Sequence, residues 1–119
     1  MNKNCTVYKT IDLIGKKWTM LLVLELYKAK ASGLRYNEIM KKIPDATSRI
    51  ISARLKEMQN KKLIKRKVDS KHIPVKIYYS LTQEGIALIK IIKDLKEWAL
   101  KWKIHNPDCE GKDCKDCEF

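Results

Sequence analysis

Three cysteines lie within nine residues near the C-terminus, at Cys109, Cys114 and Cys117, in a C-x4-C-x2-C pattern. Glycine and polar residues surround them, so no apolar core would require thiols there. Thiolates at this spacing suit Zn²⁺ or an iron–sulfur cluster, and plant-type [2Fe–2S] ferredoxins use the same local spacing. A fourth ligand is needed, for which we expect Cys5, with His105 as the local alternative. A redox disulfide, either Cys114–Cys117 or Cys5 to the tail, and an unstructured reducing tail are the competing interpretations.

The second chemical feature is a concentration of positive charge. Between Thr47 and Lys76 the chain carries ten Lys or Arg residues against two acids, so eight of the net +12 charges fall in this segment. Such clustering is typical of a surface that neutralises a phosphate backbone. A solvated lysine-rich surface would explain the total charge but not its concentration. The sequence therefore predicts a nucleic-acid partner.

Apolar periodicity predicts the elements that carry this charge. Val7, Ile11, Ile14 and Trp18 recur at helical spacing up to a break at Gly15, and residues 17–27 form a second helix, apolar on most sides and therefore central. A connector at 31–34, with a possible short strand, leads to a short helix over 36–43 that Pro44 ends.

The basic segment itself predicts a helix and a hairpin. Thr47 is a good N-cap for a helix that buries Ile51, Leu55 and Met58 and turns hydroxyls and arginines outward, as a helix in a major groove does. An ordinary polar face is the alternative. Alternating strands at 63–68 and 75–81 flank a loop, 69–74, with basic residues at its tip. The residues predicted to contact DNA are Thr47, Ser48, Arg49, Ser52, Arg54, Lys56, Lys67, Lys71, His72 and Lys76.

A last long helix should run from its cap at Thr82 to about Ile104. Its apolar residues form a heptad-like seam, at Leu88, Ile91, Leu95, Trp98 and Trp102, and a second face, at Ile86, Ile89, Ile92 and Ala99. One face can cover the core while the other needs a partner. We therefore expect a homodimer built by the first and last helices, which would also bring Cys5 near the tail. A single helix buried in a monomer core is the alternative.

Length and composition bound the protein class. The 119 residues suffice for one domain, which we place at 1–104 with a Cys-rich tail at 105–119. The longest apolar run, 20–24, is too short for a membrane span and no signal peptide is visible, so we expect a cytoplasmic protein without a membrane partner. With only His72 and His105 and no nucleophile–base constellation, an enzyme is not expected. The fold class is mainly α with a small β-hairpin (α+β).

Two motifs carry a family resemblance. The D-L-I-G-x-K-W pattern ending at Trp18 and the Y-S-L-T-x-x-G pattern ending at Gly85, together with residues 34–39 and 52–58, are similar to the HxlR-type winged helix-turn-helix regulators, relatives of the MarR group. The resemblance covers about residues 5–102. It implies a dimeric, DNA-binding transcription regulator, with Arg54 and Lys76 at the family's basic positions. Some members sense oxidants through an N-terminal cysteine where Cys5 stands. A non-sequence-specific architectural or protein-docking module is the alternative; operator and small-molecule effector are not predicted.

Overall fold

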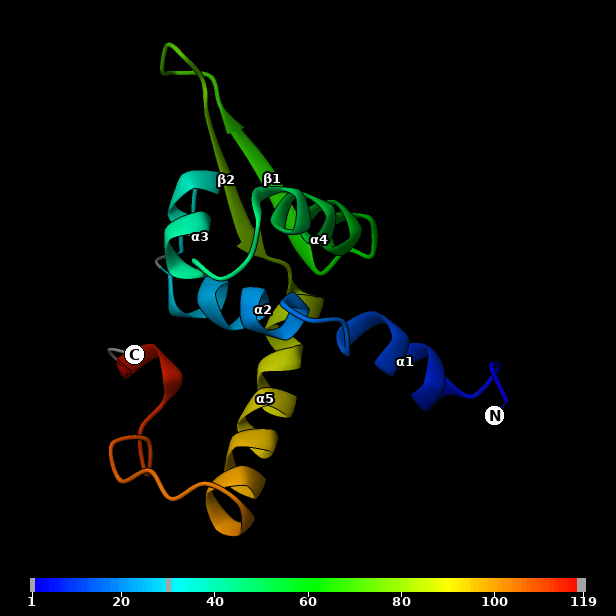
Figure 1. The fold of residues 1–119 in the computed structure, drawn as a ribbon. Helices are drawn as coiled ribbons and strands as arrows, with labels where there is room; N and C mark the ends of the chain where they lie inside the picture. The colour runs from blue at the N-terminus through cyan, green and yellow to red at the C-terminus, as the bar shows by residue number, and fades with distance from the viewer. Residues whose placement is uncertain (1, 30, 118–119) are drawn as a thin grey trace.

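The computed structural model describes residues 2–29 and 31–117 of the chain (Figure 1). In these residues helices form a compact body from which one β-hairpin projects, so the predicted α+β winged helix-turn-helix class is confirmed. The elements, in chain order, are α1 (Thr6–Ile14), α2 (Thr19–Lys28), α3 (Tyr36–Lys42), α4 (Ser48–Asn60), β1 (Ile64–Asp69), β2 (Lys76–Leu81), α5 (Gln83–Trp102) and a short 3-10 helix, η1 (Cys114–Asp116).

The core is built around α2, as its apolar sequence predicts. Leu22 and Val23 are fully buried, and they meet the buried stripe of α4 and Ile89 of α5 in one continuous cluster. Burial of these side chains supplies the main favourable term in folding. Thr19, at the start of α2, is also fully buried, and among the described residues its hydroxyl is the one buried side-chain group without a hydrogen-bond partner.

The start of α2 differs from the sequence prediction because of the backbone at Trp18. This residue has a φ of 83°, in the left-handed region, so α2 begins at Thr19 and not at residue 17. A large side chain in that region is uncommon and strained. Apolar periodicity does not record such a backbone turn, because the side-chain pattern continues through it.

The C-terminal end of α4 determines where β1 begins. The amides of Lys62 and Leu63 donate to the carbonyls of Gln59 (3.0 Å) and Met58 (2.9 Å), and Lys62 has a φ of 62°. This is a Schellman motif with lysine where glycine is usual. It occupies the Leu63 amide, so β1 starts at Ile64, one residue later than expected.

β1 and β2 pair as an antiparallel hairpin in which Lys67 faces Tyr78 and Asp69 faces Lys76. The short strand expected in the 31–34 connector is a single bridge, in which Leu34 and Tyr79 exchange backbone hydrogen bonds of 2.9 and 2.8 Å. Gly33 makes this approach possible, because a Cβ there would lie 2.1 Å from the Tyr79 carbonyl oxygen. The hairpin is thereby attached to the segment that leads into α3.

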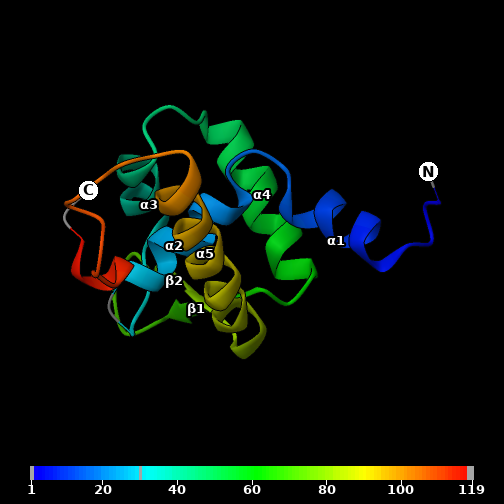
Figure 2. The same cartoon turned by 90° about the horizontal axis from the view of Figure 1, so that it is seen from below.

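The two ends of the chain leave the body on opposite sides (Figures 1 and 2). α1 projects outward and contributes no buried residue, whereas the segment after α5 turns back toward α2. α5 ends at Trp102, two residues before the expected end. Among the described residues, no helix combines the length and apolar character that crossing a membrane requires.

Candidate nucleic-acid interface

α4 presents two chemically different faces. Ile51, Leu55 and Met58 are buried as predicted, and the Thr47 hydroxyl accepts from the Ile50 amide at 3.2 Å, which confirms the predicted cap. On the outer side the structure exposes four of the predicted contact residues, Ser48, Arg49, Ser52 and Lys56. A helix with small hydroxyls and cations on its solvent face can approach base edges closely.

Tyr36 joins α3 to the outer face of α4. Its hydroxyl donates to the carbonyl of Ser48 at 3.0 Å and lies 3.1 Å from the Ser52 hydroxyl. These contacts fix the start of α4 against α3, which sets the angle of the helix pair. Tyr36 was not among the predicted site residues, because a tyrosine at the start of a short helix carries no sequence signal for this role.

Arg54 is placed differently from the other polar residues of α4. It is half-buried, and its guanidinium Nη1 lies 3.3 Å from the Glu57 carboxylate, which also accepts from Lys16 at 2.6 Å. Lys16, followed by the charge of Arg54, lowers the pKa of Glu57. A DNA contact by Arg54 stays a prediction, and it would require the guanidinium to exchange Glu57 for a phosphate or a base.

The hairpin carries the remaining predicted residues. Lys67, Lys71 and His72 are exposed, while Lys76 is half-buried. The Asp69 carboxylate accepts from the Lys71 amide at 3.0 Å and lies 3.6 Å from the His72 ring. The carboxylate near the hairpin tip therefore already has partners within the tip. Alternation places Lys65, Lys67 and Lys76 on one face of the hairpin, and Lys65 was missed by the sequence prediction.

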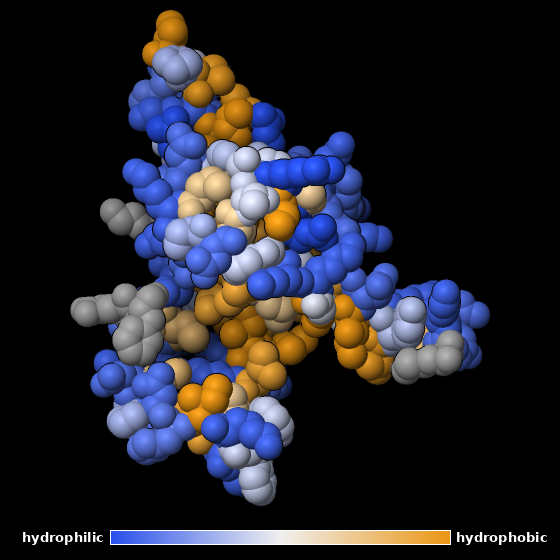
Figure 3. Space-filling view, viewed as in Figure 1, coloured by the Kyte–Doolittle hydropathy of each residue, from blue (hydrophilic) through white to orange (hydrophobic). Residues whose placement is uncertain are grey.

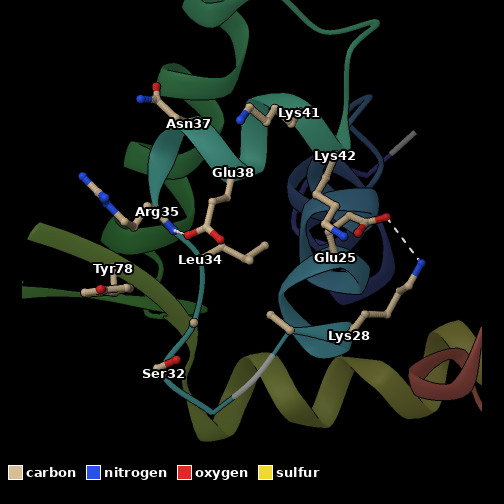
Figure 4. A pocket seen from close by; sticks show the side chains of 12 residues that line it. Glu25, Lys28, Ser32, Leu34, Arg35, Asn37, Glu38, Lys41, Lys42 and Tyr78 are labelled. Atoms are coloured by element: carbon tan, nitrogen blue, oxygen red, sulfur yellow. Dashed lines mark hydrogen bonds and ion pairs between the residues drawn. The ribbon is translucent and has the colours of Figure 1, made fainter. Parts of the chain in front are cut away.

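An open hollow of about 750 Å³ lies between α2, α3 and β2 (Figure 4). Two carboxylates in it are engaged, Glu38 with the Arg35 amide at 2.9 Å and Glu25 with Lys28 at 3.7 Å. The charged residues around it are Glu25, Lys28, Arg35, Glu38, Lys41 and Lys42. Sequence reasoning singled out none of these cations, because they stand outside the 47–76 segment.

Apolar side chains gather where α1, α2 and α5 meet, away from the hairpin (Figure 3). Several apolar side chains of α1 and α5 stand open to solvent. Their exposed fractions are 59% at Val7 and Ile11, 60% at Leu95, 53% at Trp98 and 64% at Trp102. A surface of this kind on a soluble protein marks an interaction site. Most of the predicted seam of the last helix, from Ile91 to Trp102, therefore lies outside the core, whereas Leu88 packs against it. This differs from the alternative of a helix simply buried in the core.

The cysteines are distributed over both ends of the molecule. All four are half-buried, and Cys5 at the start of α1 lies on the opposite side of the molecule from the tail (Figure 1). His105 is exposed, with its ring 3.9 Å from Glu110. Within the described residues no three His, Cys, Asp or Glu side chains come together in a group able to hold a metal. The predicted ligand set of Cys109, Cys114, Cys117 and Cys5 is thus not assembled in the described part of this chain.

A helix pair followed by a basic antiparallel hairpin defines the winged helix-turn-helix class of proteins. Comparison with known proteins agrees. The HxlR-like helix-turn-helix family matches residues 13–107, and the chain belongs to this family. It is 36% identical to the uncharacterized HTH-type transcriptional regulator YvaP of Bacillus subtilis, over 79% of this chain and 83% of the relative. The chain is accordingly a transcriptional regulator of the helix-turn-helix type.

Two solved structures are similar along most of the chain. The reduced form of the transcriptional regulator YodB from B. subtilis aligns with a TM-score of 0.72 at 29% identity, covering 92% of this chain and 98% of that one. The redox regulator HypR in its oxidized form aligns with a TM-score of 0.71 at 33% identity, covering 82% and 96%. Both structures are of regulators in a defined oxidation state.

Proposed function

We propose that the chain is a homodimeric regulator that binds specific DNA sequences, with α4 in the major groove and the β1–β2 hairpin on the flanking backbone. The observation that carries this is the outer face of α4, where Ser48, Arg49 and Lys56 stand exposed opposite a fully buried stripe. Phosphate contacts by the hairpin would position the protein, and contacts by α4 would read the bases.

Selection from random duplexes tests this proposal. The wild-type protein should enrich a palindromic site and bind it on the order of 10³-fold more tightly than random DNA at the same salt concentration. The Arg49→Ala variant should lose discrimination at one base step, by about 1–3 kcal/mol, if its guanidinium reads a guanine. Equal affinity for the enriched and random duplexes would instead identify an architectural or protein-docking module.

The dimer is supported by the open apolar surfaces of α1 and α5. Ile11 and Leu95 are 59% and 60% exposed, although removing their apolar side chains from water would be favourable. A two-fold dimer through these helices would present two copies of α4 to half-sites about one helical turn apart, or a multiple of that distance. Sedimentation that shows a monomer at micromolar concentration would contradict this arrangement.

We further propose a response to thiol oxidation or to a metal through Cys5 and the tail cysteines. Cys5 is the N-cap residue directly before α1, one of the proposed dimer helices, so a change at its thiol would act on the dimer surface. The structures of YodB and HypR, described as reduced, diamide-treated and oxidized forms, favour the redox form of the proposal for this chain. Because Cys5 and the tail lie far apart in one protomer, a link between them would have to join two protomers.

Anaerobic purification without chelator, followed by metal and sulfide analysis and an absorbance spectrum, separates the alternatives. Bound iron with sulfide indicates a cluster, and stoichiometric colourless zinc indicates a structural site. A metal-free protein whose DNA affinity falls on oxidation with diamide, and is restored by dithiothreitol, indicates a disulfide switch. If the DNA affinity of a metal-free protein ignores both the oxidant and the substitutions Cys5→Ser and Cys114→Ser, this part of the proposal fails.

A further inference from the structure

The C-terminal tail lies mostly beyond the family match, which ends at residue 107. One side chain of the tail, Asp113, is bound from two directions. Its carboxylate accepts from the Tyr27 hydroxyl of α2 at 2.9 Å and from the Lys93 ammonium of α5 at 2.7 Å. Asp113 therefore joins a helix of the core to the helix of the proposed dimer surface.

Neighbouring contacts hold the tail in the same place. The Lys96 ammonium of α5 donates to the Lys112 carbonyl, and the Lys115 ammonium lies 4.7 Å from the centre of the Tyr27 ring. Asp113 also caps η1 by accepting from the Lys115 amide at 3.0 Å. The hydrogen bond from the Lys115 amide, followed by those from Lys93 and Tyr27, holds the pKa of Asp113 well below its ordinary range. The carboxylate is thus charged throughout the neutral range, and the contact does not depend on pH there.

The second half of α5 has little other support. Ile92 is the last buried residue of this helix, and residues 93–102 extend past it for about 15 Å at 1.5 Å per residue. Three apolar side chains of this half, Leu95, Trp98 and Trp102, are more than half exposed, whereas Ala99 and Leu100 are half-buried. We call residues 93–102 the distal half of α5. Of its side chains, Lys93 and Lys96 are bound by the tail, which turns back along this half toward α2 (Figure 1).

We infer that Asp113 is a positioning residue for DNA binding: its contacts with Tyr27 and Lys93 brace the distal half of α5 and thereby set the distance between the two α4 helices of the dimer. The inference rests on the proposed function, because it presumes a DNA-binding dimer. A tilt of about 10° at Ile92 would displace the end of a 15 Å arm by roughly 2.6 Å. That displacement approaches the ~3.4 Å rise of one base pair, so the angle of the distal half would select the half-site spacing.

Two substitutions weaken the contacts that Asp113 makes with Tyr27 and Lys93, and neither removes a buried apolar group. Asp113→Asn keeps the amide cap of η1 but removes the charge that pairs with Lys93, and Tyr27→Phe keeps the ring but removes the donor. Asp108→Asn is the matched control, because this exposed tail carboxylate makes no hydrogen bond or ion pair within the described residues and the substitution changes the charge equally. Exposed charge contacts are modest, so we expect effects of about twofold to fivefold.

Hydrogen exchange on the 119-residue chain tests whether the Asp113 contacts hold the distal half of α5. At a concentration where wild type and variants are dimeric, Asp113→Asn and Tyr27→Phe should speed exchange by about twofold to fivefold in residues 93–102 and 109–117. Exchange in α4 should not change, and Asp108→Asn should match the wild type throughout. Faster exchange confined to the tail, or wild-type exchange in both variants, would overturn the inference.

The preference of the protein for one half-site spacing provides a second test, because a loss of stability alone would not change that preference. The probe is the duplex that wild type enriches from a random pool, with its centre lengthened or shortened by one and two base pairs. Asp113→Asn should keep its affinity for a single half-site but lose about twofold to fivefold of the wild-type discrimination between spacings. An equal loss of affinity for every spacing would overturn the inference. If wild type enriches no duplex, the proposed function fails, and hydrogen exchange still decides whether Asp113 holds the distal half of α5.

Discussion

Replacing Lys71 by Ala tests whether the hairpin tip binds phosphate. Lys71 is exposed, and among the described residues its ammonium has no ion-pair partner, so the change should alter the free energy of unfolding by no more than about 0.5 kcal/mol. In a dimer the substitution removes one cation from each protomer. If each cation neutralises one phosphate, the variant dimer releases two fewer counterions on binding DNA.

The magnitude follows from the number of phosphates that the variant leaves unneutralised. Each phosphate contact contributes about 0.9 to the slope of log affinity against log salt concentration, so the slope should become shallower by about 1.8. Between about 50 and 200 mM salt, a fourfold change, wild type should lose affinity by a factor about 12 larger than Lys71→Ala does. The effect should be similar on specific and random duplexes, because phosphate contacts carry no sequence information.

Fluorescence anisotropy with a labelled duplex at several salt concentrations measures the slope. Lys90→Ala is the matched control, because Lys90 is an exposed lysine of α5 that pairs with Asp94 and the net charge changes equally. Charges farther than about 10 Å from DNA are largely screened at these salt concentrations, so the control should keep the wild-type slope. A Lys71→Ala slope equal to that of wild type and Lys90→Ala would refute a phosphate contact at the tip.

Three further substitutions probe the dimer and the fold. Trp98→Glu should yield a folded monomer in sedimentation and abolish DNA binding, because this residue is 53% exposed on the apolar face; a dimer that persists would place the interface elsewhere. Lys62→Gly should raise the free energy of unfolding by about 0.5 kcal/mol in urea denaturation, since glycine relieves the positive φ, and no gain would show that the backbone there is unstrained. Thr19→Val should stabilise the protein by about 1 kcal/mol by removing a buried hydroxyl without a partner; a lower thermal midpoint would contradict that account.

The sequence was sufficient for the elements whose pattern is local. The 3.6-residue period of Ile51, Leu55 and Met58, with Thr47 before it, predicted α4 and its cap, because helix burial and capping depend on residues a few positions apart. Alternation likewise predicted the hairpin to within one residue at each strand start. The positive charge of these two elements is concentrated in one sequence segment, residues 47–76, so it can be counted without a structure. For that reason the class of protein could be predicted.

The tertiary structure decided what depends on contacts between distant residues. Tyr27 and Asp113 are 86 positions apart, and no periodicity relates them until α2, α5 and the tail pack together. Arg54 pairs with Glu57 one turn along the same helix, a contact that the sequence spacing allows, but only packing brings Lys16, 41 positions away, to that carboxylate. The turn at Trp18 is imposed by its neighbours against the local preference of the residue. Local sequence specifies periodicity and caps, whereas side-chain partners and strained backbone follow from the packing of the whole chain.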